Sequence, residues 1–549
     1  MAKLNSIFKS AVHPYKDTVK GMYTKFQDTN AIKAAEVYSK MTNATIFNRS
    51  NGEDKFDGKR KILERDAQSL GALLVNTLAT KTAEMLFPVN SPFFKIEETP
   101  SMARVSTELG YGDSTARDKH YNQIEQTASK RLFLNGGYAE LYRAIQLLII
   151  TGNALIYRDK VNKRFITYDL NQYVISRNEV GDVNFIIRKE PVHIYELDGE
   201  VRSILGIDSL HDEFETLELY TMINRVTKPV KVTMDDGKVE MVDRYAYRVY
   251  QEIQGKIITA EADVHSYNEL ECPYITLTWR RNHSEHYGRG HVEDYSADLA
   301  LYSEISFKLY EYIAAMLKFV MIVPASTASV DDLIAAENGN YVAVASGTQQ
   351  YPMQALEGGI YQKVVEIANV LQNLELRLSK AFIYNANVRD SERTTAEEIR
   401  TQIRETEYTL GQAYTNLSTE LHTRLATVLT SEFDPQMIEL ATQEAITFDV
   451  SVGLASLNRS ANVTKFQYAA NAIQLVVPVF SQASQRFNIE AVIDQILDGY
   501  GIDKESILYT EEQLQQKIAE TQQQMQEQSQ LMQAPASNTE VNSQQLGLT

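Results

Sequence analysis

The chain has 549 residues, of which 44% are hydrophobic, and it carries a formal net charge of −18. Such a chain can bury a sizeable core, whereas its charge argues against ordinary nucleic-acid binding, which needs Lys and Arg to neutralise phosphates. Cys272 is the single cysteine, so no disulfide can form within the chain and a reducing compartment is expected. The N-terminus lacks the apolar core of a signal peptide, and the most apolar runs are shorter than the ~18–20 residues of a membrane span, so we expect no membrane partner.

The first 150 residues are predicted to be mainly helical. One helical stripe ends at Pro88 and consists of Leu74, Leu78, Ala79 and Met85. Residues 154–280 are instead rich in Val, Ile, Thr and Tyr with period-2 alternation, which is typical of strands. Asp236-Gly237 is a strong hairpin-turn signal. The sequence therefore predicts an α+β fold, mainly helical, with an inserted antiparallel β region at about 154–280.

After the β region, apolar residues recur at helical spacing over 293–317 and again over 361–384. Short β-like pieces and turn residues alternate over 319–357 between these two helices. The longest helix is expected to begin near residue 394, because Thr394 with Glu397, or Thr395 with Glu398, can form a capping box. Its apolar period continues to about residue 431, so the rod would span roughly 50 Å at 1.5 Å per residue.

The C-terminal part is predicted to hold two or three shorter helices over 463–500, followed by a Gln-rich helix with a weak heptad stripe. This Gln-rich helix is equally typical of an oligomerising helix and of a disordered tract. After Pro535 the composition favours disorder. Residues 490–549 hold ten acids and two lysines, a net charge of −8, which taken alone is typical of simple solubility.

A short charged loop, 385–394, separates the second of the paired helices from the longest one. Its candidate site residues are Asn387, Arg389, Asp390, Ser391, Glu392 and Arg393. Taken alone, such a loop is more typical of an ordinary connection with internal salt bridges than of a binding site.

Catalytic motifs are absent from the sequence. Gly52 to Lys59 has one residue too many for a phosphate-binding loop, and Arg60 stands in place of its Ser/Thr. The run at 112–116 lacks the closing glycine of a nucleophile elbow. We therefore expect no enzyme activity, no ATPase activity and no cofactor.

Two clusters have alternative interpretations. His283, His286 and His291 could bind zinc, but the segment is a glycine loop without a metal-binding helix, which favours a hydrogen-bonded loop between domains. Arg280 and Arg281 beside Trp279 could stack on a base, although salt-bridge partners are the more common use of such a pair.

Five stretches carry a resemblance to a known family. They are "GALLVNTLATKTAEMLFPVNSPFFKI" (71–96), "LLIITGNALIYRD" (147–159), "YGRGHVEDYSADLALYSEIS" (287–306), "RLSKAFIYNANVRDSERTTAEEIRTQIRETEYTLGQAYTNLSTEL" (377–421) and "GIDKESILYTEEQLQQK" (501–517). With these stretches the chain resembles the portal proteins, or head-to-tail connectors, of short-tailed bacteriophages over about residues 55–525. The long stretch at 377–421 is the most specific of the five.

The resemblance implies a structural ring of about twelve subunits at one vertex of the capsid, assembled in the host cytoplasm and retained in the virion. DNA would be packaged and ejected through the ring. The implied partners are double-stranded DNA in transit, a terminase motor, a tail adaptor protein, and the major capsid and scaffolding or internal core proteins.

The resemblance also implies a division of the chain. The parts are a wing over 1–290, a first stem helix over 291–318, a clip over 319–358, a second stem helix over 359–384, a tunnel loop over 385–394, a long wing helix and return over 395–460, a crown over 461–505, and a barrel helix with a flexible tail over 506–549. In this interpretation the loop at 385–394 lies at the DNA channel, and the acidic C-terminal part repels DNA so that it slides.

Two alternatives stay open at this point. One is an oligomeric tail or capsid adaptor that never contacts DNA. The other is a metal-dependent enzyme that uses His283, His286 and His291.

Overall fold

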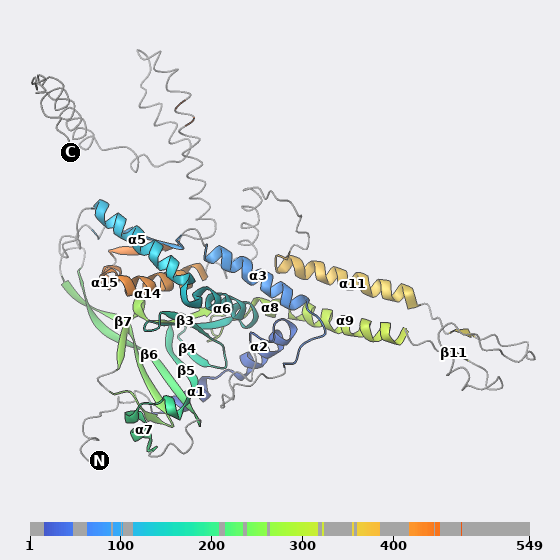
Figure 1. The fold of residues 1–549 in the computed structure, drawn as a ribbon, viewed down its shortest axis with the longest axis horizontal. Helices are drawn as coiled ribbons and strands as arrows, with labels where there is room; N and C mark the ends of the chain where they lie inside the picture. Colours follow the sequence, from blue (N-terminus) through green and yellow to red (C-terminus); the bar gives the residue numbers. More distant parts are fainter. Residues whose placement is uncertain are drawn as a thin grey trace, which may run out of the picture. The chain divides into compact units, whose positions relative to one another are not determined.

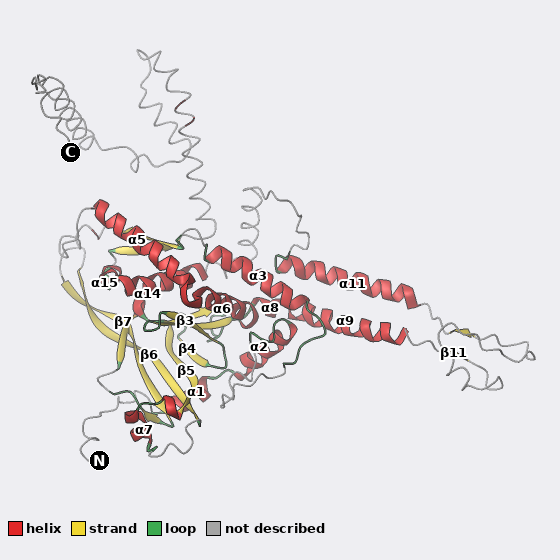
Figure 2. Ribbon diagram, viewed as in Figure 1, coloured by secondary structure: helices red, strands yellow, loops and turns green. Residues whose placement is uncertain are grey.

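The computed structural model describes residues 16–47, 63–88, 92–99, 102, 114–207, 215–233, 239–260, 264–316, 321–322, 354–355, 360–384, 417–443 and 445–450, with two single positions further on. The chain divides into two compact units, residues 1–454 and 455–549. All elements named below belong to the first unit. They form a mixed α+β structure, as the sequence predicts (Figures 1 and 2).

Helices form the centre of this unit. The two central ones are α3 (Leu70–Leu86) and α6 (Gly137–Thr151), which pack against each other. Leu74, Leu78 and Ala79 of α3 are fully buried, so the predicted stripe is confirmed. The helices near them are α1 (Val19–Phe26), α2 (Thr29–Met41), α5 (Ser114–Phe133), α14 (Thr423–Phe433) and α15 (Gln436–Thr442).

The predicted β region is confirmed as two antiparallel sheets. The larger has the order β4-β5-β6-β7-β8, with β9 also paired to β7; its strands are β4 (Tyr173–Arg177), β5 (Val183–His193), β6 (Thr216–Thr233), β7 (Val239–Ile253), β8 (Lys256–Ile257) and β9 (His265–Asn268). The smaller has the order β10-β2-β3; its strands are β2 (Asn153–Asp159), β3 (Arg164–Tyr168) and β10 (Tyr274–Thr278). A short helix, α7 (Gly199–Leu205), lies between β5 and β6 in sequence.

The predicted hairpin at Asp236-Gly237 fits the pairing of the two longest strands. The last described pair of β6 and β7 is Thr233 with Val239, so the chain reverses between these residues. The turn residues themselves lie outside the described part of the chain.

One strand interrupts the helical N-terminal region and was not predicted. β1 (Phe94–Glu98) pairs in antiparallel register with β13 (Ile446–Val450). Phe94 and Ile96 are buried while Lys95 and Glu97 are exposed, so β1 has one face toward the core and one toward solvent.

A pair of long helices continues from this body (Figures 1 and 2). Helix α9 (Ser296–Met316) follows the one-turn helix α8 (His291–Asp294), and α11 (Ile360–Ala381) packs against α9. They run antiparallel, since Arg377 near the end of α11 pairs with Asp298 near the start of α9. The predicted helices at 293–317 and 361–384 are therefore confirmed, with a break at Tyr295 and an end at Ala381.

Between α9 and α11, two short strands, β11 (Met321–Ile322) and β12 (Gln354–Ala355), pair with each other. The predicted long helix from 394 is described only from Leu417, where a π-helical turn (Leu417–His422) precedes α14. Among the described helices, none combines the length and apolarity that crossing a bilayer would require.

Candidate functional site

The seam between α9 and α11 follows a 3–4 spacing. On α11 the inward positions are Ile367, Leu371, Leu374 and Leu378, and the last two are buried. This spacing is that of a coiled-coil seam, in which each helix covers one face of the other. Leu299 is the fully buried contribution of α9 at its start. Within the described residues, the two helices thus pack against each other, and α2 and α3 also contact α9 and α11, respectively.

Helices α9 and α11 carry a large share of the exposed apolar side chains. Seven of the 15 exposed large hydrophobic side chains in the described part of the chain lie on these two helices, with exposures from 39% to 67%. They are Leu301, Phe307, Tyr310, Ile313, Val365, Val370 and Leu376. Exposed apolar patches of this kind mark protein–protein contacts. The sequence predicted both helices but not which side they would leave open.

The start of α9, which we call its root, is fixed where two backbone segments cross closely. Helix α6 ends at Thr151 and is capped by Gly152, whose φ of +78° is left-handed. The segment Gly288–Gly290 passes directly over this end: a Cβ on Gly290 would lie 2.7 Å from the Ile150 carbonyl oxygen, and one on Gly288 would lie 2.6 Å from the Gly152 carbonyl oxygen. Only glycine allows this approach, so the core of the unit directly determines where α8 and α9 begin.

The three histidines near this root do not form a metal site. His286 accepts a hydrogen bond at Nδ1 from the Arg177 backbone N–H at 3.1 Å, and His291 is buried with Nε2 3.0 Å from the Ala381 carbonyl oxygen. His283 is exposed. Across the described residues, no three His, Cys, Asp or Glu side chains are arranged to hold a metal ion. The zinc interpretation of this cluster is therefore wrong. The hydrogen bonds of the predicted loop are confirmed, but the loop lies within one compact unit and not between domains.

His291 of α8 instead contacts the end of α11. Because a carbonyl oxygen only accepts, Nε2 of His291 carries the hydrogen and donates it to the last turn of α11. Its ring packs edge-on against Trp279 and Phe382, at centroid distances of 5.7 and 4.8 Å. Burial lowers the pKa of His291, which keeps it neutral.

Trp279 and its arginine neighbours have structural roles. Trp279 is buried, which excludes base stacking, and Arg280 forms an ion pair with Asp294 of α8. The salt-bridge interpretation of this pair is confirmed for Arg280.

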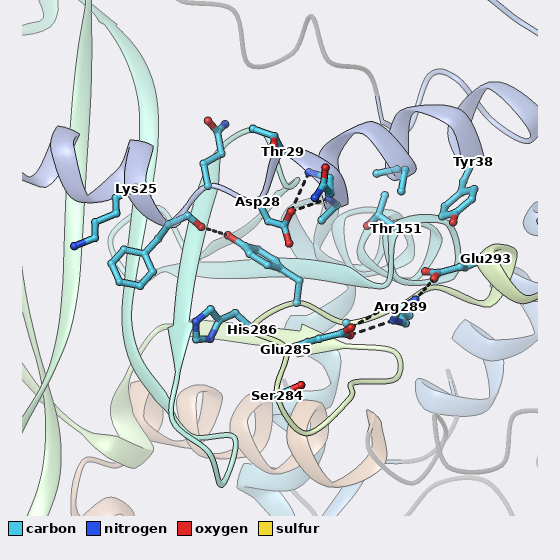
Figure 3. A pocket seen from close by; sticks show the side chains of 18 residues that line it. Lys25, Asp28, Thr29, Tyr38, Thr151, Ser284, Glu285, His286, Arg289 and Glu293 are labelled. Carbon is cyan, nitrogen blue, oxygen red and sulfur yellow. Dashed lines mark hydrogen bonds and ion pairs between the residues drawn. The ribbon is translucent and has the colours of Figure 1, made fainter.

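A cavity of about 670 Å³ lies between the α1–α2 connection and the histidine loop. Figure 3 shows Arg289 at its edge, ion-paired with Glu285 and Glu293. Asp28, also in the wall, accepts hydrogen bonds from the backbone N–H groups of Asn30 and Ala31 at the start of α2. Arg289 and its two glutamates are thus engaged in ion pairs, and Asp28 is engaged in capping α2.

The candidate loop residues Asn387, Arg389, Asp390, Ser391, Glu392 and Arg393 lie outside the described residues. Their role stays a prediction. The same holds for the parts named crown and barrel helix, and for most of the clip.

The described part of the chain thus combines a mixed α+β body with a pair of long helices that carry exposed apolar side chains. Residues 17–508 match the family of the "Bacteriophage head to tail connecting protein". The chain is 34% identical over 519 residues to the portal protein of Pseudomonas phage phiKMV, covering 94% of this chain and 96% of that protein. It is 28% identical over 468 residues to the portal protein of Escherichia phage T7, covering 83% and 82%.

The chain therefore belongs to the bacteriophage head-to-tail connecting proteins, the portal proteins. It is a structural, non-enzymatic virion component at the junction of head and tail. A chain from the virion of a native gene transfer agent particle also matches, over 87% of this chain and 95% of its own length, with 11% identity and a TM-score of 0.38.

Proposed function

We propose that about twelve copies of this chain close into a ring whose bore passes double-stranded DNA during packaging and ejection. The observation that carries this proposal is the set of exposed apolar side chains on α9 and α11. A ring closes by repeating one head-to-tail contact, so each helix pair would lie against that of the next copy. Burying a large apolar side chain contributes about 1.5–3 kcal/mol, and seven such side chains are available on each copy.

The division of the chain follows from this arrangement. In the proposal, α8–α9 and α11 are the stem, the residues between them form the clip that meets the packaging motor and the tail adaptor, and the body before residue 290 belongs to the wing. Residues 461–505 form the crown, and the helix from 506 forms a barrel on the capsid side. A terminase motor, a tail adaptor and the capsid or scaffolding proteins are the proposed partners.

The acidic C-terminal part then has a mechanical role. DNA carries one negative charge per about 1.7 Å of its axis, so an electronegative bore repels it from all sides and lets it slide. The net charge of −8 over residues 490–549 would be repeated in every subunit. In the loop at 385–394, Arg389 and Arg393 would touch phosphates briefly, and Asp390 and Glu392 would keep these contacts weak.

Ring formation can be tested by placing a charged side chain on the exposed surface of α9. Phe307→Glu places a carboxylate in the proposed contact, where it would be desolvated, so the purified protein should remain monomeric by light scattering. Wild-type protein should show an annulus end-on in negative stain. Val161→Glu is the matched control, because Val161 is 88% exposed in the turn between β2 and β3. A ring that forms equally well with Phe307→Glu would contradict the proposed contact.

DNA contact is tested separately in particles. Arg389→Gln with Arg393→Gln should lower the amount of genome that assembled particles retain, whereas Arg164→Gln, an exposed arginine of β3, should not. Full retention by the loop variant would favour an adaptor whose loop does not handle DNA.

A further inference from the structure

We infer that the free end of strands β6 and β7 is a contact surface for a second copy of this chain, and that Tyr245 is its central contact residue. The inference rests on the proposed function, because the second copy is the next subunit of the ring. It adds a contact on the body of the chain to the contact proposed for α9 and α11.

Strands β6 and β7 continue beyond the sheet to which they belong (Figure 1). The pairing of β5 with β6 ends at Asn224, and the pairing of β9 with β7 ends at Ala246. The next seven pairs, residues 227–233 with residues 239–245, have no third strand beside them among the described strands. We call these two segments the ribbon, which is about 20 Å long at roughly 3.3 Å per residue. A two-stranded hairpin alone is only marginally stable in water, so a ribbon gains stability from a partner.

One face of the ribbon is open to solvent. Successive residues of a strand point to opposite faces, so Met241, Asp243 and Tyr245 share one face. Thr227 and Pro229 lie opposite Tyr245 and Asp243 on that face. All five side chains are exposed, Met241 to 61% and Tyr245 to 48%. The half-buried residues of the other face are Val242 and Arg244. We call the exposed side the open face.

Tyr245 is held in place before any partner arrives. The Arg225 guanidinium lies over its ring, 3.4 Å from the ring centroid. Arg225 is itself fixed by an ion pair with Asp182 at 3.1 Å. A side chain that is already ordered loses little conformational entropy on binding, and tyrosine is enriched among the residues that dominate binding energy at interfaces. Tyr245 therefore has the properties of a preorganised contact residue.

The charge of this region favours an acidic partner. Residues 225–229 and 241–248 hold four cations and one anion, a net charge of +3, whereas the whole chain carries −18. A basic ribbon on an acidic chain is complementary to the surface of another copy. In a ring that repeats one head-to-tail contact, each copy would give its ribbon to the next. DNA would also be attracted by cations, but the exposed Met241 and Tyr245 fit a protein surface better than phosphates.

Protection of a thiol on the open face gives the first readout. The native Cys272 is buried, and burial raises the pKa of its thiol to about 11, so it reacts slowly with maleimide. Thr227→Cys places an exposed thiol opposite Tyr245 and leaves Tyr245 itself unchanged. In assembled rings this thiol should react about tenfold more slowly than in Phe307→Glu monomers, because the contact excludes the reagent. Val161→Cys, in the exposed turn between β2 and β3, should react equally fast in both.

A change at Tyr245 tests its central role in the same assay. Thr227→Cys combined with Tyr245→Ser should lose most of the protection while rings still form through α9 and α11. Thr227→Cys combined with Tyr245→Phe keeps the ring of the side chain and should keep the protection. Equal protection in the Ser and Phe variants would overturn Tyr245 as the central contact residue.

Mixed rings of unlabelled and ¹⁵N-labelled copies identify the occupant. A carbodiimide joins an amine to a carboxylate in direct contact, so the exposed Lys228 of the ribbon should be linked to an Asp or Glu of a copy with the other label. Mass spectrometry of the linked peptides measures this, and Lys228→Gln should remove the product. Links found only between identically labelled peptides would show that the ribbon contacts its own chain and would overturn the inference.

The failure of this contact is distinguishable from the failure of the ring. Annuli in negative stain whose Thr227→Cys thiol reacts as fast as in monomers would overturn the ribbon contact and leave the ring intact. Wild-type protein that forms no annulus would overturn both. If Phe307→Glu still assembles, monomers are obtained by dilution and the protection assay decides as before. Protection in whole particles but not in purified rings would assign the ribbon to another virion protein and overturn the second copy as its occupant.

Discussion

Asn153 holds Gly288 by two reciprocal hydrogen bonds. The side-chain Nδ2 of Asn153 donates to the Gly288 carbonyl oxygen at 2.8 Å, and the Gly288 N–H donates to Oδ1 at 2.7 Å. Both residues are buried. The amide thus replaces a backbone partner for the segment that leads into α9. Together with the backbone crossing at Gly290, this side chain at the start of β2 holds the segment that leads into the proposed stem.

Asn153→Ala should therefore lower stability strongly. The change leaves the N–H and carbonyl of Gly288 buried without these partners, at a cost of about 1–3 kcal/mol for each group. Denaturant unfolding of the full chain measures the loss. Asn162→Ala, at an exposed turn asparagine, is the control and should stay within about 0.5 kcal/mol of wild type. Equal stability of the two variants would refute the role of Asn153.

Gly290→Ala tests the backbone crossing. The added methyl would lie 2.7 Å from the Ile150 carbonyl oxygen, so the crossing must open, at a cost of about 1–3 kcal/mol. Gly199→Ala is the matched control for Gly290→Ala, because a Cβ on Gly199 meets no atom within 4 Å. Thermal unfolding should separate the two, and a wild-type melting temperature for Gly290→Ala would show that the crossing can relax.

Glu432→Gln tests the buried ion pair that joins α14 to β2. Arg158 is 1% exposed and binds the Glu432 carboxylate at 2.8 and 3.0 Å. Leaving the guanidinium buried without a counter-charge should cost about 3–5 kcal/mol. Glu64→Gln, which breaks an exposed pair with Lys40, should change unfolding little. A small effect of Glu432→Gln in the same assay would mean that solvent reaches Arg158.

Acid stability should depend on Glu98 at the end of β1. The hydrogen bond from Arg117 holds the pKa of this carboxyl below its usual range. Its stabilising contribution is therefore present above the unfolded-state pKa and is lost as pH falls through the lower folded-state pKa. The stability difference between wild type and Arg117→Met should be constant near neutral pH and shrink below about pH 4. A difference that does not change with pH would contradict this assignment.

Chelators should leave the protein unchanged. His286 and His291 already use ring nitrogens in hydrogen bonds within the fold, so stoichiometric zinc is not expected in the purified protein. Metal analysis and melting curves with and without a chelator check this. Zinc bound at one equivalent and lost in His286→Ala would contradict it.

Periodicity predicted the local elements well. The β region at about 154–280 and the helices before and after it were evident from the sequence, because apolar spacing of 3.6 or 2 residues depends only on neighbouring residues. The outer face of α9 was not evident. Ile305, Leu309 and Ile313 predict a helix, but apolar residues such as Phe307 lie between them, and only the position of α11 decides which side is covered.

Long-range contacts explain the other differences. The alternation of Phe94 and Ile96 spans only five residues, and its partner strand begins at Ile446, so no local pattern could connect them. The three histidines are close in sequence, yet His286 contacts the end of β4, whereas His291 contacts the end of α11. Sequence spacing reports possible ligands, whereas the fold decides where each nitrogen points.

The pairing of β1 with β13 also has a consequence for synthesis. β1 leaves the ribosome early, but its partner emerges only after some 350 further residues. Until then Phe94 and Ile96 have no strand beside them, and an unpaired strand edge invites aggregation. A nascent chain released prematurely would expose this edge, so chaperone binding to incomplete chains should concentrate near residues 94–98.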